Sequence, residues 1–249
     1  MGRYFLHLGY KGTRYFGWQE QPGQPTVQAT IEENIAVLFR QKIKITGCGR
    51  TDTGVHARNF YAHFDIDEAI LAKPEVVVYK LNCLLPPDIK IINIIPVDDN
   101  AHARFDATHR QYKYYIAPKK EVFLGDYAWQ LFKNLDIEKM NKAAGLLLNY
   151  SDFTSFSKLH SGAKTNICNI KNARWYAEKG LLVFDISADR FLRNMVRAIV
   201  GTLVDIGKNK IGLNDFCRII ENKDRQEAGT SVPACGLFLE NVYYSYLKA

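Results

Sequence analysis

The sequence predicts an α+β protein in which helices pack against a largely antiparallel sheet. Strand-like and helical segments mix in each half of the chain. In the second half, Lys179-Gly180 separates two strand-like segments and predicts an antiparallel hairpin. This combination of helices and antiparallel strands is typical of the α+β class. A domain boundary is expected near residue 105, with an N-terminal lobe over residues 1–105 and a C-terminal lobe over residues 106–249.

The first half begins with a strand over residues 4–10, which are rich in aromatic side chains and alternate weakly in polarity. Thr26 is a suitable N-cap for the helix that follows. The apolar stripe of this helix comprises Val27, Ile31, Ile35 and Leu38. Residues 42–46 and 60–66 alternate in polarity, which predicts a strand on each side of a glycine-rich segment.

The remaining elements of the first half surround a pair of prolines. A helix over residues 73–84 ends at Pro86-Pro87, because proline cannot continue a helix. Residues 89–96 predict a further strand. A polar stretch then leads to an aromatic strand over residues 112–117, which opens the second half.

The second half repeats the mixture of helices and strands. Asp136 caps a helix whose apolar positions are Ile137, Met140, Ala144 and Leu147. The hairpin strands cover residues 170–178 and 181–187. Helices over residues 191–206 and 213–221 follow, and a last strand covers residues 236–246.

Composition excludes several classes of protein. The 249 residues are 47% apolar and 24% charged, which excludes a disordered or fibrous chain. No apolar run is long enough to span a bilayer, and the N-terminus lacks the features of a secretory signal. The formal charge of +7 suits a phosphate-rich partner, but it equally suits a basic protein without one. Five cysteines without a CxxC pair indicate free thiols in a reducing cytoplasm and no structural zinc.

The first candidate for chemistry is the segment over residues 47–57, GCGRTDTGVHA. Its glycines allow the backbone to turn tightly and approach a ligand. Asp52 lies in the middle and could act as a nucleophile or base if a cation holds it ionised. The alternative is a structural turn, because Asp-x-Gly is common turn chemistry. His56 is either a general base or a hydrogen-bonded packing residue.

Two further candidates carry arginines and tyrosines. In the segment over residues 189–207, taken as helical, Arg190, Arg193 and Arg197 follow at spacings of three and four and so share one face. They would bind an anion, either phosphate or a carboxylate such as Asp52, or else form a solvated basic face. In the strand over residues 112–117, Tyr112 and Tyr114 point the same way. Their rings could stack on an unpaired base or simply pack in a half-buried strand.

The aromatic segment over residues 10–21 is the last candidate. It contains the sequence GTRYFGWQEQP, in which aromatic, glycine and amide side chains cluster. This segment is either an RNA-contacting loop or a packed turn around Trp18.

Together these segments resemble the tRNA pseudouridine synthase A family. The main signature is GCGRTDTGVHA followed by AHFD. Further segments before and after this signature also match the family, and all the matches occur in the family's order over nearly the whole chain. They are residues 10–21, Thr26-Val27-Gln28, Leu81-Asn82 with the proline segment over residues 85–89, residues 103–114, residues 152–157, residues 191–197 and residues 233–237.

The resemblance implies a fold and an activity. The fold would be two pseudouridine-synthase lobes, ferredoxin-like, around a continuous and mainly antiparallel sheet with a central basic cleft. The activity would be that of an isomerase, an intramolecular transferase that converts uridine to pseudouridine in the anticodon stem-loop of tRNAs, at about positions 38–40. The resemblance also implies a cytoplasmic homodimer in which each tRNA touches both subunits, with no metal, organic cofactor or membrane.

Four residues take their roles from the resemblance. Asp52 stands where the family has its essential nucleophile, and Arg197 matches the arginine that pairs with it. Tyr112 matches the tyrosine that stacks on the target uracil, with Tyr114 as the second choice. Arg50 matches the arginine that holds the flipped nucleotide out of the stem.

The chain departs from the family pattern at two positions. Thr53 replaces a common alanine in the signature, which is a small change. Phe60 replaces a glutamine found in many relatives, and the loss of this amide bears on substrate choice. Two alternatives therefore accompany the main hypothesis: a catalytically silent RNA-binding module, and a pseudouridine synthase that acts on a different RNA.

Overall fold

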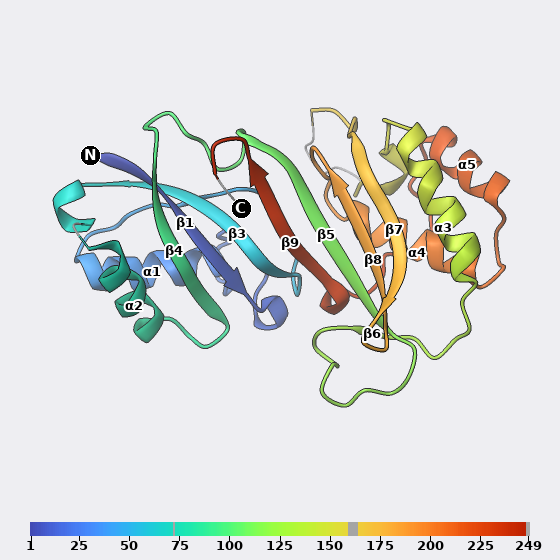
Figure 1. The fold of residues 1–249 in the computed structure, drawn as a ribbon, viewed down its shortest axis with the longest axis horizontal. Coiled ribbons are helices and arrows are strands. Elements are labelled where there is room, and N and C mark those ends of the chain that lie inside the picture. The colour runs from blue at the N-terminus through green and yellow to red at the C-terminus, as the bar shows by residue number, and fades with distance from the viewer. Residues whose placement is uncertain (72, 159–163, 248–249) are drawn as a thin grey trace. The chain divides into compact units, whose positions relative to one another are not determined.

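The computed structural model describes residues 1–71, 73–158 and 164–247 (Figure 1). Over these residues the chain forms nine β-strands and five α-helices, together with short 3₁₀ turns. The strands are mostly antiparallel. The predicted α+β class with a largely antiparallel sheet is therefore confirmed. The chain divides into two compact units, Met1–Thr108 with Leu239–Ala249, and His109–Phe238.

The first unit is built on four long strands. Both β3 and β4 pair antiparallel with β1, and α2 packs on β4 while α1 packs on α2. Thr26 caps α1 as predicted, since its side chain accepts a hydrogen bond from the Ala29 N–H. The strand order is β4 (Ile89–Val97), β1 (Gly2–Tyr10), β3 (His56–Ile66) and β9 (Leu237–Tyr244), with β2 (Thr46–Gly47) beside β3; the helices are α1 (Val27–Phe39) and α2 (Pro74–Leu84).

The second unit combines three long strands and the short β6 with three helices. The predicted hairpin is present, and its turn places Lys179 and Gly180 at φ values of 48° and 81°. Asp136 caps α3 by accepting from the Lys139 N–H, and α3 packs on both β7 and α4. The strand order is β5 (Ala107–Ala117), β8 (Leu181–Ala188) and β7 (Ile170–Glu178), with β6 (Trp129–Gln130) parallel to β5; the helices are α3 (Ile137–Leu146), α4 (Met195–Gly207) and α5 (Leu213–Asn222).

The start of α4 differs from the sequence prediction. The helix begins at Met195, four residues later than expected, because Asn194 adopts a left-handed conformation with φ 68°. A residue in this region cannot continue a right-handed helix. Arg190 and Arg193 therefore precede the helix, and the prediction that they share a helical face with Arg197 was wrong.

The predicted strand over residues 42–46 is reduced to β2 (Thr46–Gly47). The reason lies at Ile45, whose backbone N–H donates to the Glu32 carboxylate and whose carbonyl accepts from the Gln28 side chain. These side chains occupy the hydrogen-bonding groups that a neighbouring strand would use. Two further differences are that β5 begins five residues before the predicted start and that the short β6 was not predicted.

Three further findings concern the cysteines, the helices and the metal-ligating side chains of the described residues. None of the five cysteines, all within the described residues, forms a disulfide. Among the helices described, none is both long and apolar enough to cross a membrane. Nor does the described part of the chain bring three His, Cys, Asp or Glu side chains together as a metal site.

Candidate active site

The four predicted site residues divide between the two units. Arg50 and Asp52 lie in the first unit, on the loop that joins β2 to β3. Tyr112, on β5, and Arg197, on α4, lie in the second unit.

The loop around Asp52 is a turn that leaves the carboxylate partly exposed to solvent. The Val55 N–H donates to the Asp52 carbonyl over 3.1 Å, and Gly54 adopts φ 79°. Glycine is favoured there because a left-handed conformation costs it no steric strain. The Asp-x-Gly turn chemistry is thus present, and it is made through the Asp52 backbone carbonyl.

Residues 10–18 of the first unit form hydrogen bonds with this loop. The Trp18 N–H donates to the Thr51 carbonyl over 3.3 Å, and the Gly54 N–H donates to the Tyr15 carbonyl over 3.3 Å. The hydroxyls of Tyr10 and Thr51 are hydrogen-bonded over 2.8 Å in a buried position. Residues 10–18 therefore hold the turn on both sides of Asp52, at Thr51 and at Gly54.

Glycine allows the close approach of these two segments. A Cβ atom on Gly17 would lie 2.3 Å from the Thr51 carbonyl oxygen, and one on Gly12 would lie 2.0 Å from that of Val55. Trp18 is only 2% exposed, so it lies at the centre of a packed turn. Of the two interpretations of residues 10–21, the packed turn around Trp18 agrees with this geometry.

Phe60, on β3, packs against Trp18 and Gly47 next to the same loop. Its side chain is fully buried and stacks on Trp18, with the ring centroids 4.0 Å apart. A Cβ atom on Gly47 would lie 2.5 Å from Trp18 Nε1, so the entry to the loop rests on this aromatic pair. A buried ring cannot contact substrate directly. The hypothesis of a different RNA substrate therefore loses the only residue that supported it.

His56 is buried and hydrogen-bonded to the backbone. The residue is 1% exposed, and its Nδ1 accepts a hydrogen bond from the Gly12 N–H over 3.1 Å. A histidine that accepts through Nδ1 carries its proton on Nε2 when neutral. This geometry agrees with the packing interpretation of His56 rather than with a general base.

Arg50 and Cys48 face different surroundings on the same loop. The Arg50 side chain is exposed and makes no hydrogen bond or ion pair with the described residues. Cys48 is 1% exposed, and its backbone N–H donates to the Tyr61 carbonyl over 2.7 Å. Arg50 can therefore extend toward a ligand, while the thiol of Cys48 is covered.

In the second unit, the two candidate tyrosines have different environments. Tyr114 is fully buried and its hydroxyl donates to the Pro233 carbonyl over 2.8 Å. Burial raises the pKa of its phenol far above the ordinary value. Tyr112 is partly exposed, and its ring meets Phe191 edge to face at 5.1 Å. Only Tyr112 retains ring surface for stacking on a base.

Arg197 is fixed at the first turn of α4. Its Nε donates to the Val232 carbonyl over 2.7 Å, and the Val232 N–H donates back to the Arg197 carbonyl over 3.2 Å. Pro233, the next residue, accepts the Tyr114 hydroxyl. Because Tyr112 and Tyr114 lie on one face of β5, about 7 Å apart along the strand, Tyr112 and Arg197 belong to neighbouring parts of the second unit.

The sequence singled out residues 10–21 and Gln28 but did not predict that they support the Asp52 loop, and it did not single out Glu32. Tyr10, Gln28 and Glu32 contact the loop or the segments that flank it. The glycines at positions 12 and 17, within an aromatic segment, were the available signal, because they predict close contact with another backbone.

Comparison with known proteins identifies the relatives of this chain. A model of the tRNA pseudouridine synthase family matches residues 8–106 and 143–245, which include Arg50, Asp52 and Arg197 but not Tyr112. The chain is 51% identical to the tRNA pseudouridine synthase A of Porphyromonas gingivalis over 246 residues, which cover 98% of both chains. It is 52% identical to the enzyme of that name from Parabacteroides distasonis over 244 residues, 98% of this chain and 96% of the relative. Identity to the one from Dictyoglomus thermophilum is 38% over 241 residues, 96% and 98% of the two chains.

Proposed function

The chain belongs to the tRNA pseudouridine synthase A family, and we propose that it isomerises uridine to pseudouridine in the anticodon stem-loop of tRNAs with Asp52 as nucleophile. The observation that carries the choice of Asp52 is the loop around it. Residues 10–18 fix the backbone on both sides of this carboxylate, while the side chain stays partly exposed. A preorganised nucleophile needs this combination of a rigid backbone and access to substrate.

The proposed reaction rearranges bonds without net redox change or hydrolysis. Asp52 attacks the substrate, at either the anomeric carbon or the uracil ring, and the bond between N1 and the ribose breaks. The base rotates and rejoins the ribose through carbon 5, while the proton on carbon 5 is lost and N1 gains one. The product is an isomer of the substrate, and the protein regains a free carboxylate. No metal or organic cofactor enters this scheme.

The other three residues bind and orient the substrate in this proposal. Arg197 pairs with Asp52 and keeps it ionised when RNA covers the site, because a nearby cation opposes the effect of burial. Tyr112 stacks on the target uracil through its accessible ring. Arg50, which is exposed beside Asp52, holds the nucleotide out of the stem. Such contacts offset the cost of unstacking the base, about a few kcal/mol.

The same proposal includes the RNA-binding cleft, the oligomeric state and the cellular location of the enzyme. Two lobes, over residues 1–105 and 106–249, would form a basic cleft for the anticodon stem-loop, and two subunits would share each tRNA in the cytoplasm. The net charge of +7 supports binding of a phosphate-rich molecule. A silent RNA-binding module is the alternative from another class, but it would have no use for a carboxylate held in this way.

The test measures tritium release from tRNA labelled at carbon 5 of uridine. Asp52→Asn and Asp52→Ala are expected to abolish release while retaining most of the tRNA affinity, because each variant removes the nucleophile and leaves the loop backbone in place. Thr53→Ala in the same turn serves as the control and should keep the wild-type rate. Undiminished release from the Asp52→Ala variant would end the proposal. Wild-type protein that binds tRNA without forming pseudouridine would favour the silent module.

A further inference from the structure

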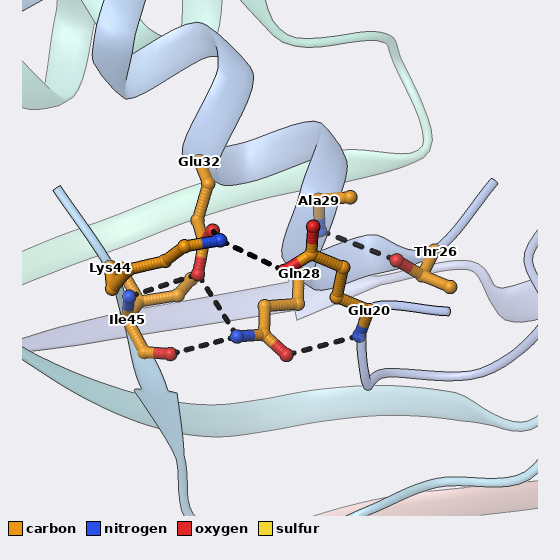
Figure 2. A network of polar contacts seen from close by, with 7 residues as sticks. All are labelled: Glu20, Thr26, Gln28, Ala29, Glu32, Lys44 and Ile45. Carbon is orange, nitrogen blue, oxygen red and sulfur yellow. Dashed lines mark hydrogen bonds and ion pairs between the residues drawn. The ribbon is translucent and has the colours of Figure 1, made fainter. Parts of the chain in front are cut away.

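Gln28, near the start of α1, joins the two chain segments that flank the Asp52 loop (Figure 2). Its Nε2 donates to the Ile45 carbonyl over 3.0 Å, and its Oε1 accepts from the Glu20 N–H over 3.1 Å. Its backbone N–H donates to the Trp18 carbonyl over 3.0 Å. Ile45 leads into β2 and the loop, whereas Trp18 holds Thr51 on the other side. One residue therefore sets the distance between the entry to the loop and its support.

The carboxylate of Glu32 fixes the orientation of the Gln28 amide. Glu32 is 8% exposed, and its Oε1 accepts from both Gln28 Nε2 (2.9 Å) and the Ile45 N–H (3.1 Å). Its Oε2 accepts from Lys44 Nζ over 2.7 Å. Figure 2 shows the Gln28 amide between Ile45 and the Glu20 backbone, with the Glu32 carboxylate above it. Because both amide hydrogens have acceptors and the amide oxygen has a donor, rotation of the amide would break all three contacts.

This network replaces a strand partner at the entry to the loop. Both backbone hydrogen-bonding groups of Ile45 are satisfied by side chains of α1, and the regular pairing of β2 begins only at Thr46. The position of the entering chain consequently depends on two side chains rather than on a continuous ladder of backbone bonds. A displacement of about 1 Å at a reacting group can lower a rate about 100-fold.

We propose that Gln28 is a positioning residue for Asp52: its side chain joins Ile45, at the entry to the loop, to Glu20, two residues beyond the Trp18 that holds Thr51. This inference rests on the proposed role of Asp52 as nucleophile. Gln28 does not touch the substrate. Its loss is therefore expected to lower kcat for pseudouridine formation while KM and the dissociation constant for tRNA stay near the wild-type values.

The principal variant is Gln28→Met, which keeps the length of the side chain and removes its hydrogen bonds. We expect kcat to fall about 10- to 100-fold, with the tRNA dissociation constant within about threefold of wild type. Gln28→Glu places a second carboxylate against Glu32 and should lower kcat at least as far. The double variant Gln28→Glu/Glu32→Gln restores a donor and an acceptor at this contact. It is expected to recover part of the kcat that Gln28→Glu loses, which a general loss of stability would not do.

Asn34→Leu on the same helix is the matched control. Among the described residues, the Asn34 amide donates only to the Thr30 carbonyl of α1, over 2.8 Å, and to no residue of the loop. Its kcat should equal that of wild type. All kcat values are measured well below the unfolding temperature of each variant, determined by circular dichroism. Wild-type kcat in Gln28→Met, or a fall in kcat matched by the loss of folded protein or of tRNA affinity, would overturn the inference.

Parallel measurements separate this inference from the proposed function. Wild type and Asp52→Asn are assayed with the same tRNA. If wild type forms no pseudouridine, or if Asp52→Asn still forms it, the proposed function fails and the inference fails with it. If both behave as expected and Gln28→Met keeps its kcat, only the role of Gln28 fails.

Discussion

Two tyrosines separated by one residue illustrate how environment decides what a side chain can do. Tyr112 and Tyr114 share a face of β5, and the sequence pattern alone does not separate them. Tyr114 donates its hydroxyl to Pro233 in the core, so its ring is unavailable to a ligand. Tyr112 stays partly exposed. Two residues on the same face of one strand are therefore a core residue and a candidate base-stacking residue.

His63, on β3, makes the stability of the first unit depend on pH. It is 8% exposed, and its Nδ1 accepts from the Ala103 N–H over 3.2 Å. Burial, followed by the nearby charges of His102 and Arg3, lowers the pKa of His63 from 6.5 to about 4, against the opposing effect of Asp65 and Asp106. Between these two values the unfolded chain binds a proton that the folded chain does not.

Stability due to His63 is therefore complete above pH 6.5 and is lost as the pH falls toward 4. His63→Asn is the informative variant, because its side-chain oxygen can still accept from Ala103 and it does not titrate. Urea unfolding midpoints between pH 7.5 and pH 4 should fall less steeply for the variant than for wild type. Parallel curves for the two proteins over this range would contradict the prediction.

At the level of elements, local signals predicted most of the fold. Caps at Thr26 and Asp136 and the turn at Lys179-Gly180 determine structure through neighbouring residues, and each was predictable. The late start of α4 was not, because the left-handed conformation of Asn194 accompanies a hydrogen bond to Ser231, far along the chain. The contacts that support the Asp52 loop were not predicted, for the same reason. It depends on contacts between segments that are distant in sequence.

Gly201 in α4 offers a test of how the helix holds Arg197. A Cβ atom there would lie 2.0 Å from the Thr230 carbonyl oxygen, so Gly201→Ala must displace residues 229–232. Arg197 is anchored to Val232 and would move with this segment. We expect a loss of about 1–3 kcal/mol in the free energy of unfolding and a fall in kcat. Urea unfolding and the tritium-release assay would measure the two effects.

Gly145 in α3 is the matched control for this substitution. Both glycines lie inside helices, but a Cβ atom on Gly145 has nothing within 4 Å. Gly145→Ala should leave kcat unchanged and raise stability by up to about 1 kcal/mol, because alanine has the higher helix propensity. Equal effects of the two substitutions would show that crowding against residues 229–232 is not the cause.

At the scale of the whole molecule, the chain returns to its first unit at the end. Residues from Leu239 onward pack with Met1–Thr108. Asn59 donates to the Glu240 carbonyl and to the Asn241 side chain, each over 2.9 Å. The N-terminal half of the sequence therefore carries the Asp52 loop, but the unit that contains this loop is completed only by the last strand.

Tyr244 is the residue at which this dependence can be tested. It is 6% exposed, its hydroxyl donates to the Ala103 carbonyl over 2.6 Å, and its ring contacts Phe5 and Tyr61 at 5.2 and 5.3 Å. Tyr244→Ala leaves a cavity and an unpaired carbonyl, at a cost of about 3–5 kcal/mol. Hydrogen exchange should then accelerate in peptides from β1 and β3, more than in peptides from β7 and β8.

Tyr246→Phe is the control for this experiment, since Tyr246 is 46% exposed and, within the described residues, its hydroxyl bonds only to the Asp106 carboxylate. This variant should leave exchange in β1 and β3 close to wild type. Equal acceleration in both units after Tyr244→Ala would mean that the two units unfold together. Exchange unchanged everywhere would mean that the last strand is dispensable to the unit that holds Asp52.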